Sequence, residues 1–163
     1  MKWFNPVPKT LEELKKMYRT LAMKHHPDVK GGNTTDMQEI NNEYDKLFAM
    51  LKDVHTTADG KTYTETTNET PEQFRNIIDK LITLDGVVIE IVGCWIWLTG
   101  KTYQHKEIIK SLHFQFSKSK KAWYYHNDNY TKRSKKTFTL DQLKDLYGSQ
   151  TITDKPHIKL AIV

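Results

Sequence analysis

Pro27 constrains the fold of the N-terminal third more than any other residue, because it separates two helical stretches. The residue before a proline disfavours helical geometry, so a helix that starts after Thr10 must end near His25. Thr10 begins one capping box, and a second helix cap is expected at Thr35. Apolar residues recur at helical spacing on both sides of the proline: Leu11, Leu14, Tyr18, Leu21 and Ala22 before it, and Met37, Ile40, Tyr44, Leu47, Phe48 and Leu51 after it. The sequence therefore predicts an antiparallel helical hairpin over residues 1–54.

The rest of the chain predicts a different kind of structure. Residues 55–69 are rich in Thr and poor in large aliphatic side chains, which indicates a linker, although a short edge strand is compatible with part of it. The second unit, residues 70–163, opens with a capped helix and continues with β-branched and aromatic runs. It predicts helices after Thr70, from 103 to 112 and after Thr139, and strands within 87–98, 114–116, 122–126 and the tail 152–163. The expected fold class is α+β, with a helical hairpin followed by a small domain built on an antiparallel sheet.

Composition excludes several classes of protein. Four Trp, eight Tyr and six Phe in 163 residues require a core, and no apolar run reaches the roughly 20 residues of a membrane span. The single cysteine, Cys94, cannot form an internal disulfide, which favours a reducing, cytoplasmic location. Cys94 is expected to be a small buried hydrophobe in a strand. The seven His residues show no ligand spacing and no nucleophile or acid–base set emerges, so neither an enzyme, nor a metal site, nor a cofactor is expected.

The sharpest motif is ELKKMYRTLAMKHHPD at 13–28, followed by MQEINNEYDKLF at 37–48. This combination resembles the J-domain of DnaJ-type co-chaperones, covering that family's second helix, its His-Pro-Asp loop and its third helix. The second half of the chain resembles, more loosely, the module that follows such J-domains in small phage and mobile-element proteins. The resemblance implies binding to a DnaK-type chaperone and stimulation of its ATP hydrolysis.

The resemblance also implies which residues contact that chaperone. By position these are Lys15, Tyr18, Arg19 and Lys24 on the helix, and His26, Pro27 and Asp28 in the loop. Basic residues four and five positions apart on a helix can steer an acidic partner surface. Asp28 can accept a bidentate hydrogen bond from an Arg of the partner.

Basic charge is concentrated in the second unit. Residues 101–136 carry ten Lys/Arg against two Asp/Glu, within a chain whose net charge is +5. Exposed aromatic rings beside such a tract can stack on bases while the cations contact phosphates. The candidate residues for nucleic acid or a protein client are Trp95, Trp97, Lys118, Lys120, Lys121, Trp123, Tyr125, Lys132, Arg133, Lys135 and Lys136. The same Trp residues are equally compatible with a simple hydrophobic core, and strand alternation leaves open which face is buried.

Two functions follow as expectations. The first is a non-enzymatic co-chaperone that recruits a DnaK-type ATPase through its N-terminal hairpin and directs it to a protein or nucleoprotein client. The alternative is a protein that binds single-stranded nucleic acid through its second unit, with the hairpin as a structural remnant. No membrane partner is expected.

Overall fold

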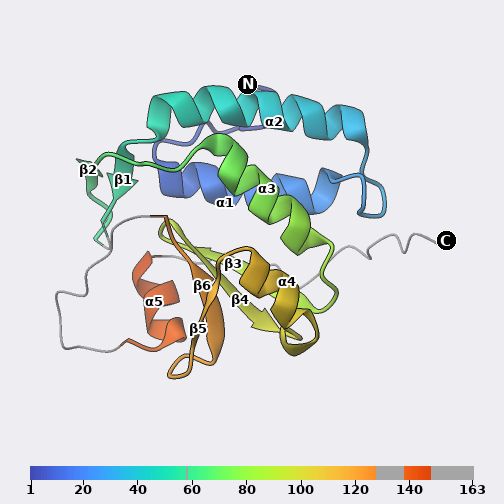
Figure 1. Cartoon of the computed structure of the whole chain (residues 1–163). Coiled ribbons are helices and arrows are strands. Elements are labelled where there is room, and N and C mark those ends of the chain that lie inside the picture. Colours follow the sequence, from blue (N-terminus) through green and yellow to red (C-terminus); the bar gives the residue numbers. More distant parts are fainter. Residues whose placement is uncertain (58, 128–137, 148–163) are drawn as a thin grey trace.

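The computed structural model describes residues 1–57, 59–127 and 138–147 (Figure 1). The fold is α+β, as expected, with an N-terminal helical pair and antiparallel sheets. Its elements, in chain order, are α1 (Leu11–His25), α2 (Thr34–Leu51), β1 (Val54–Thr56), β2 (Thr62–Thr64), α3 (Pro71–Ile82), β3 (Val87–Val92), β4 (Trp95–Gly100), a 3-10 turn η1 (Tyr103–His105), α4 (Lys106–Ser111), β5 (Gln115–Ser117), β6 (Ala122–Tyr125) and α5 (Leu140–Tyr147).

The helices begin where side chains can satisfy their first backbone N–H groups. Thr10 caps α1 as predicted, but Glu13 accepts its hydrogen bond from the Lys9 N–H and so does not complete the predicted capping box. Thr70 and Gln73 form a complete capping box on α3, as predicted. The cap predicted at Thr35 is wrong. Asn33 caps α2 instead, because its backbone is extended and its Oδ1 accepts a hydrogen bond from the Asp36 N–H at 2.8 Å.

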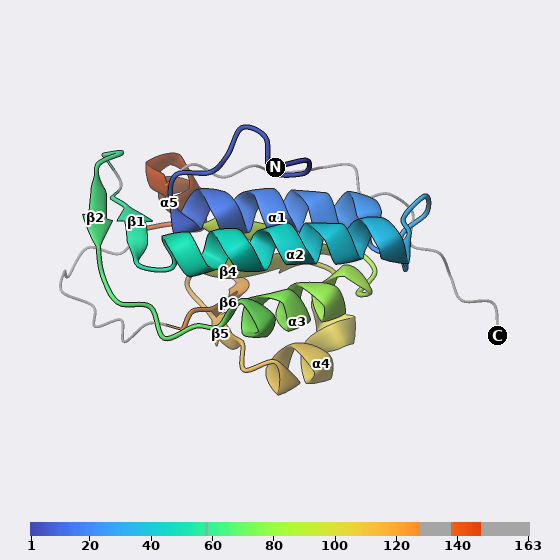
Figure 2. The ribbon, with the colours of Figure 1, turned by 90° about the horizontal axis from the view of Figure 1, so that it is seen from above.

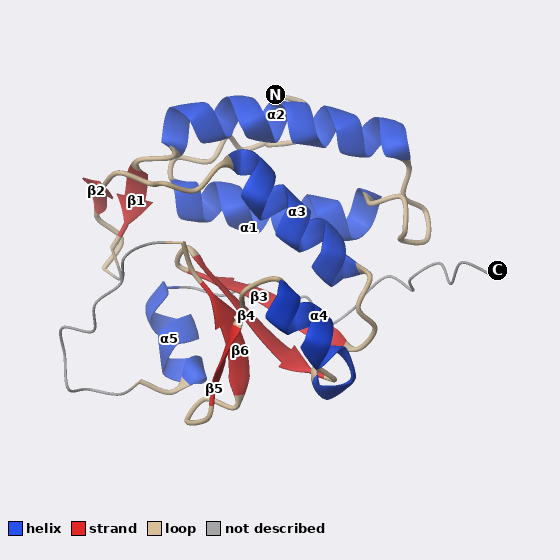
Figure 3. Ribbon diagram, viewed as in Figure 1, coloured by secondary structure: helices blue, strands red, loops and turns tan. Residues whose placement is uncertain are grey.

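A four-stranded antiparallel sheet, in the order β3-β4-β6-β5, lies beneath the helical layer (Figure 3). The apolar run in which strands were expected, residues 87–98, forms the two strands β3 and β4 on either side of Gly93. Val92 pairs with Trp95, so the turn contains only Gly93 and Cys94. Gly93 has a φ of 60°, which a tight hairpin turn requires and glycine adopts without strain. Cys94 therefore lies in a turn and not in the predicted strand.

The segment expected to be a linker is folded against the helices. β1 and β2 pair as an antiparallel hairpin at one end of the helical pair, and both His55 and Glu69 are buried (Figure 1). The short edge strand with which part of this segment is compatible is present at Thr62–Thr64.

One hydrophobic core extends across both expected units. It contains residues of α1 and α2, residues of α3 and one face of the sheet, including Tyr18, Tyr44, Phe74, Ile89 and Leu98. A smaller cluster on the other face of the sheet joins Val92, Trp97 and Ala122 to Leu140 of α5. Seen from above, α1, α2 and α3 lie side by side over the sheet (Figure 2).

Within the described residues, none of the helices combines the length and apolar character required to cross a membrane. The strand predicted for residues 152–163 lies outside the described part of the chain.

Candidate functional site

The His-Pro-Asp sequence forms a fixed corner at the end of α1, as the proline predicts. The His26 backbone has a ψ of 136°, which ends the helix, and its N–H still donates to Ala22 O at 2.9 Å. The loop then folds back on the helix end, because Val29 N–H donates to His26 O at 2.9 Å and Asn33 N–H donates to His25 O at 3.1 Å. These backbone hydrogen bonds hold the corner rigid.

The side chains of the corner have opposite environments. His26 is buried and Asp28 is exposed, with 56% of its side chain accessible. The Asp28 N–H donates to His26 Nδ1 at 3.2 Å, so a neutral His26 carries its ring proton on Nε2. That nitrogen lies 3.6 Å from Oδ1 of Asp79 on α3. The Asp79 carboxylate thus faces the buried imidazole at a distance longer than a hydrogen bond, while the Asp28 carboxylate is exposed to solvent.

Three of the residues predicted to contact a chaperone do not form an exposed face. Lys15, Tyr18 and Arg19 are each at most 3% exposed, because α3 and the sheet pack on this side of α1. Tyr18 is a core residue whose hydroxyl donates to Asn41 Oδ1 at 2.9 Å. Lys24 is exposed, so the accessible part of the predicted surface consists of Lys24, Pro27 and Asp28.

The four aromatic candidates for a binding surface lie on two different faces of the sheet. The register pairs Trp97 with Tyr124 and Leu98 with Trp123, so Trp123 and Tyr125 lie on the face opposite to Trp95 and Trp97. Trp123 and Tyr125 pack against the main core. Trp97 is only 3% exposed under α5. These four residues therefore do not share one face, because the register of β4 with β6 places the two pairs on opposite sides of the sheet.

The aromatic rings of Trp95, Tyr124 and His126 stack on one another. Trp95 stacks on Tyr124 with ring centroids 5.7 Å apart and on His126 at 4.1 Å. Of the lysines in the β5–β6 turn, Lys118 and Lys121 are exposed, and Lys120 Nζ lies 6.0 Å from the Trp97 ring centroid. The candidates Lys132, Arg133, Lys135 and Lys136 lie outside the described residues.

A cluster of polar side chains that the sequence analysis missed lies at the other end of α1. The Cys94 thiol donates to Glu12 Oε1 at 3.2 Å, and His55 Nδ1 lies 3.1 Å from the same oxygen and 3.8 Å from Cys94 Sγ. These three residues are the one group of potential metal ligands found among the described residues. They come from α1, β1 and the β3–β4 turn, so the long sequence separations hide them.

The charges in this cluster are coupled. The hydrogen bond to Glu12 raises the pKa of His55, against the effect of burial. Burial raises the pKa of the Glu12 carboxyl, but hydrogen bonds from His55 and the surrounding donors outweigh it and leave that pKa lowered. Burial also raises the pKa of the Cys94 thiol well above its ordinary value, despite the nearby charge of Lys15. In the absence of a ligand, Glu12 and His55 form an ion pair and Cys94 remains a thiol.

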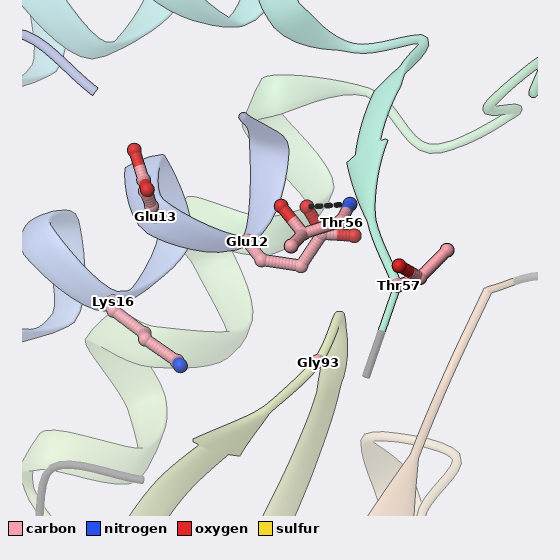
Figure 4. A pocket seen from close by; sticks show the side chains of 6 residues that line it. All are labelled: Glu12, Glu13, Lys16, Thr56, Thr57 and Gly93. Carbon is pink, nitrogen blue, oxygen red and sulfur yellow. Dashed lines mark hydrogen bonds between the residues drawn. The ribbon is translucent and has the colours of Figure 1, made fainter. Parts of the chain in front are cut away.

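A buried ion pair lies directly beside this cluster. Lys15 Nζ contacts Glu69 Oε2, and both side chains are at most 3% exposed. The same Nζ lies 3.4 Å from Cys94 O. A pocket of about 140 Å³ opens next to the cluster and is lined by Glu12, Glu13, Lys16, Thr56, Thr57 and Gly93 (Figure 4). The cluster, in which Glu12 and His55 are buried and Cys94 is half-buried, thus borders an open pocket.

Comparisons with protein-family models, with curated proteins and with solved structures find no match to this chain.

Proposed function

We propose that the chain is a DnaJ-like co-chaperone that binds a DnaK-type ATPase through the His26-Pro27-Asp28 corner and stimulates its ATP hydrolysis. The observation that supports the proposal most is the exposed Asp28 carboxylate beside a backbone fixed by Pro27. A rigidly presented carboxylate suits a charge-assisted hydrogen bond to an Arg of the partner. Lys24, one turn before the corner, adds an exposed positive charge that can steer an acidic surface.

The burial of Lys15, Tyr18 and Arg19 narrows the proposed contact surface. In this conformation the partner touches the corner and Lys24, and it reaches the three buried residues only if α3 moves away from α1. The second unit then has two roles: it covers the end of α1, with Asp79 of α3 facing His26, and it presents the surface that selects the client.

Single-turnover ATP hydrolysis by a DnaK-type chaperone tests the proposal. Wild-type protein should stimulate hydrolysis, and Asp28→Asn should weaken the stimulation about 10- to 100-fold, because a hydrogen bond to a charged group contributes about 1.5–3 kcal/mol. Asp59→Asn is the matched control, since Asp59 is an exposed carboxylate in the β1–β2 hairpin, at the opposite end of the helical pair (Figure 1). Equal stimulation by all three proteins, or none by folded wild type across several DnaK-type chaperones, would overturn the proposal.

Single-stranded nucleic acid is the second candidate partner, and the exposed Lys118 and Lys121 favour it. Binding that depends on these lysines should weaken steeply with salt and fall in the Lys118→Glu, Lys121→Glu double variant. Lys101→Glu with Lys110→Glu is a control of equal charge on the exposed surface elsewhere. Equal loss in both double variants would indicate a nonspecific charge effect and not a site in the β5–β6 turn.

A further inference from the structure

The cluster of Glu12, His55 and Cys94 presents three different ligand atoms to one point. The separations are 3.1 Å between His55 Nδ1 and Glu12 Oε1, 3.2 Å between Cys94 Sγ and Glu12 Oε1, and 3.8 Å between Cys94 Sγ and His55 Nδ1. Tetrahedral zinc, with bonds of about 2.0–2.1 Å to N and O and about 2.3 Å to S, separates its ligand atoms by about 3.3–3.6 Å. The three atoms therefore already lie near the spacing of three corners of such a tetrahedron.

Two of the three ligands, His55 and Glu12, are each held in place by an outer partner. His55 Nε2 lies 3.1 Å from Glu65 O, and a hydrogen bond to that carbonyl holds the proton of a neutral imidazole on Nε2. Once the Nδ1 proton that faces Glu12 is lost, Nδ1 can bind an ion. Glu12 Oε2 accepts a hydrogen bond from the Thr56 N–H at 3.1 Å (Figure 4). Oε1 of the same carboxylate contacts the other two ligands. Outer partners of this kind orient the ligands of protein metal sites.

The same geometry argues against a Cys-His-Glu catalytic triad. In a triad the imidazole uses one nitrogen for the nucleophile and the other for the carboxylate. Here the thiol and the carboxylate face the same nitrogen, Nδ1, while Nε2 is directed at Glu65 O and Thr67 Oγ1. The three side chains therefore converge as ligands and do not form a proton relay.

We propose that Glu12, His55 and Cys94 bind one zinc-class divalent transition-metal ion. A set of one carboxylate, one imidazole and one thiolate suits zinc better than magnesium or calcium, which prefer oxygen ligands alone. Three protein ligands leave a fourth position for water or another ligand. The Cys94 thiol releases its proton on binding, and His55 binds through its neutral form. The ion would tie α1, β1 and the β3–β4 turn together.

The neighbouring charges are compatible with this occupancy. Deprotonated Cys94 and Glu12 supply two negative charges, which a divalent cation neutralises. Lys15 beside them is paired with Glu69, which reduces its repulsion of a bound cation. The pocket bordered by Glu12, Thr56 and Gly93 gives solvent a route to the vicinity of the site. The site lies at the end of α1 away from the His-Pro-Asp corner and does not depend on the proposed chaperone binding.

Titration of the purified, chelator-treated full chain with Co²⁺ and then Zn²⁺ tests the site. We expect one equivalent of Co²⁺ to bind and to give a thiolate-to-cobalt charge-transfer absorption, which Zn²⁺ then removes by displacement. Because Cys94 is the only cysteine, that absorption alone assigns the sulfur ligand in wild-type protein. Zn²⁺ should also slow alkylation of Cys94 by a thiol reagent. Folded wild type that binds neither ion stoichiometrically would overturn the proposal, as would binding without the charge-transfer absorption.

Single substitutions then test the ligand set. Cys94→Ala, His55→Gln and Glu12→Gln should each weaken Zn²⁺ binding more than about 100-fold, because even loss of an outer partner typically costs 10–100-fold. His105→Gln is the matched control, since His105 also contacts a backbone carbonyl, Asp85 O at 3.0 Å, but lies outside the cluster. Wild-type affinity in all three folded ligand variants would overturn the assignment. If a variant does not fold, the wild-type spectrum and the alkylation rate decide the question.

Discussion

Asp79 occupies a position that is unfavourable for its own charge. Its carboxyl lies 3.6 Å from His26 Nε2 and is partly buried between α3 and the corner of α1. Burial raises the pKa of Asp79, and the charges of His26 and Arg75 offset only part of that effect. A carboxylate with a raised pKa destabilises the folded state once it ionises. Its presence beside His26 is therefore better explained by positioning of the imidazole than by stability.

Replacement of Asp79 by Asn should stabilise the protein at neutral pH. Below the usual Asp pKa of about 3.9 the carboxyl is protonated in both the folded and the unfolded state, so Asp and Asn are nearly equivalent. As pH rises through the raised pKa, the wild type loses stability that the variant keeps. Urea unfolding between pH 4 and 7.5 should show a gap that widens with pH. A variant that is less stable than wild type at pH 7 would show that attraction between the Asp79 carboxylate and His26 stabilises the fold more than burial of that carboxylate destabilises it.

Glycine is required at position 32 because the backbone of His26 lies too close for a side chain, and not because of the backbone angles of Gly32. A Cβ at this position would lie 2.0 Å from His26 O, the carbonyl that accepts the Val29 N–H. Gly32→Ala should therefore displace the corner and destabilise the protein by about 1–3 kcal/mol, as overpacking does. Gly31→Asn is the control: Gly31 has a φ of 87° with open space around it, and Asn tolerates that region. Urea denaturation of both variants measures the difference, and equal stability would contradict the steric argument.

Helix boundaries followed from local chemistry and were largely predictable. The caps at Thr10, Thr70 and Thr139 depend on residues three positions apart, and the structure contains all three. The α2 cap was misplaced because Asn33 and Thr35 are both good caps, and only the loop geometry selects Asn33. The spacing of residues along α1 could not reveal that its face with Lys15, Tyr18 and Arg19 is buried, since the residues that cover this face come from the second unit.

The two candidate sites differ in predictability for the same reason. Pro27 and its neighbours are contiguous, so sequence alone placed the corner at the end of α1. The cluster of Glu12, His55 and Cys94 joins positions 39 to 82 residues apart, and it exists only because the β3–β4 turn reaches α1. The same limit applies to the aromatic residues, whose division between two faces depends on the sheet register.

At the level of elements, the buried ion pair of Lys15 and Glu69 joins α1 to the segment before α3. Burial lowers the pKa of Lys15, but the facing Glu69 charge outweighs it, so Lys15 remains protonated. Glu69→Gln should cost about 3–5 kcal/mol, because it leaves an uncompensated buried ammonium group. Lys15→Met combined with Glu69→Leu should cost less than Glu69→Gln alone, since an apolar pair replaces both charges. Urea unfolding measures the free energy of unfolding of both variants. A smaller loss of stability in Glu69→Gln than in the double variant would contradict the buried-charge argument.

At the level of the whole molecule, the three N-terminal helices depend on one another. Tyr18, Tyr44 and Phe74 come from α1, α2 and α3, and their ring centroids are 4.4 to 6.0 Å apart. Arg75 on α3 makes two hydrogen bonds to the Asp45 carboxylate on α2, at 3.0 and 3.1 Å. The helical pair therefore contributes its apolar face to a core that α3 and the sheet complete, which distinguishes it from an independently stable hairpin.

Because the helices and the sheet share one core, we expect the described part of the chain to unfold in a single cooperative transition. A fragment of residues 1–69 lacks Phe74, Ile78 and Leu81, so it would expose Tyr18 and Tyr44, and each large side chain left unburied costs about 1.5–3 kcal/mol. We expect this fragment to be largely unfolded by far-UV circular dichroism at temperatures where the full chain is native. In the full chain, urea transitions followed by circular dichroism and by Trp fluorescence should coincide, because three of the four Trp residues lie in the sheet while the longest helices lie above it. Two separate transitions, or a fragment with its own sigmoidal melt, would show instead that the hairpin folds independently and that α3 is a detachable cover over Lys15, Tyr18 and Arg19.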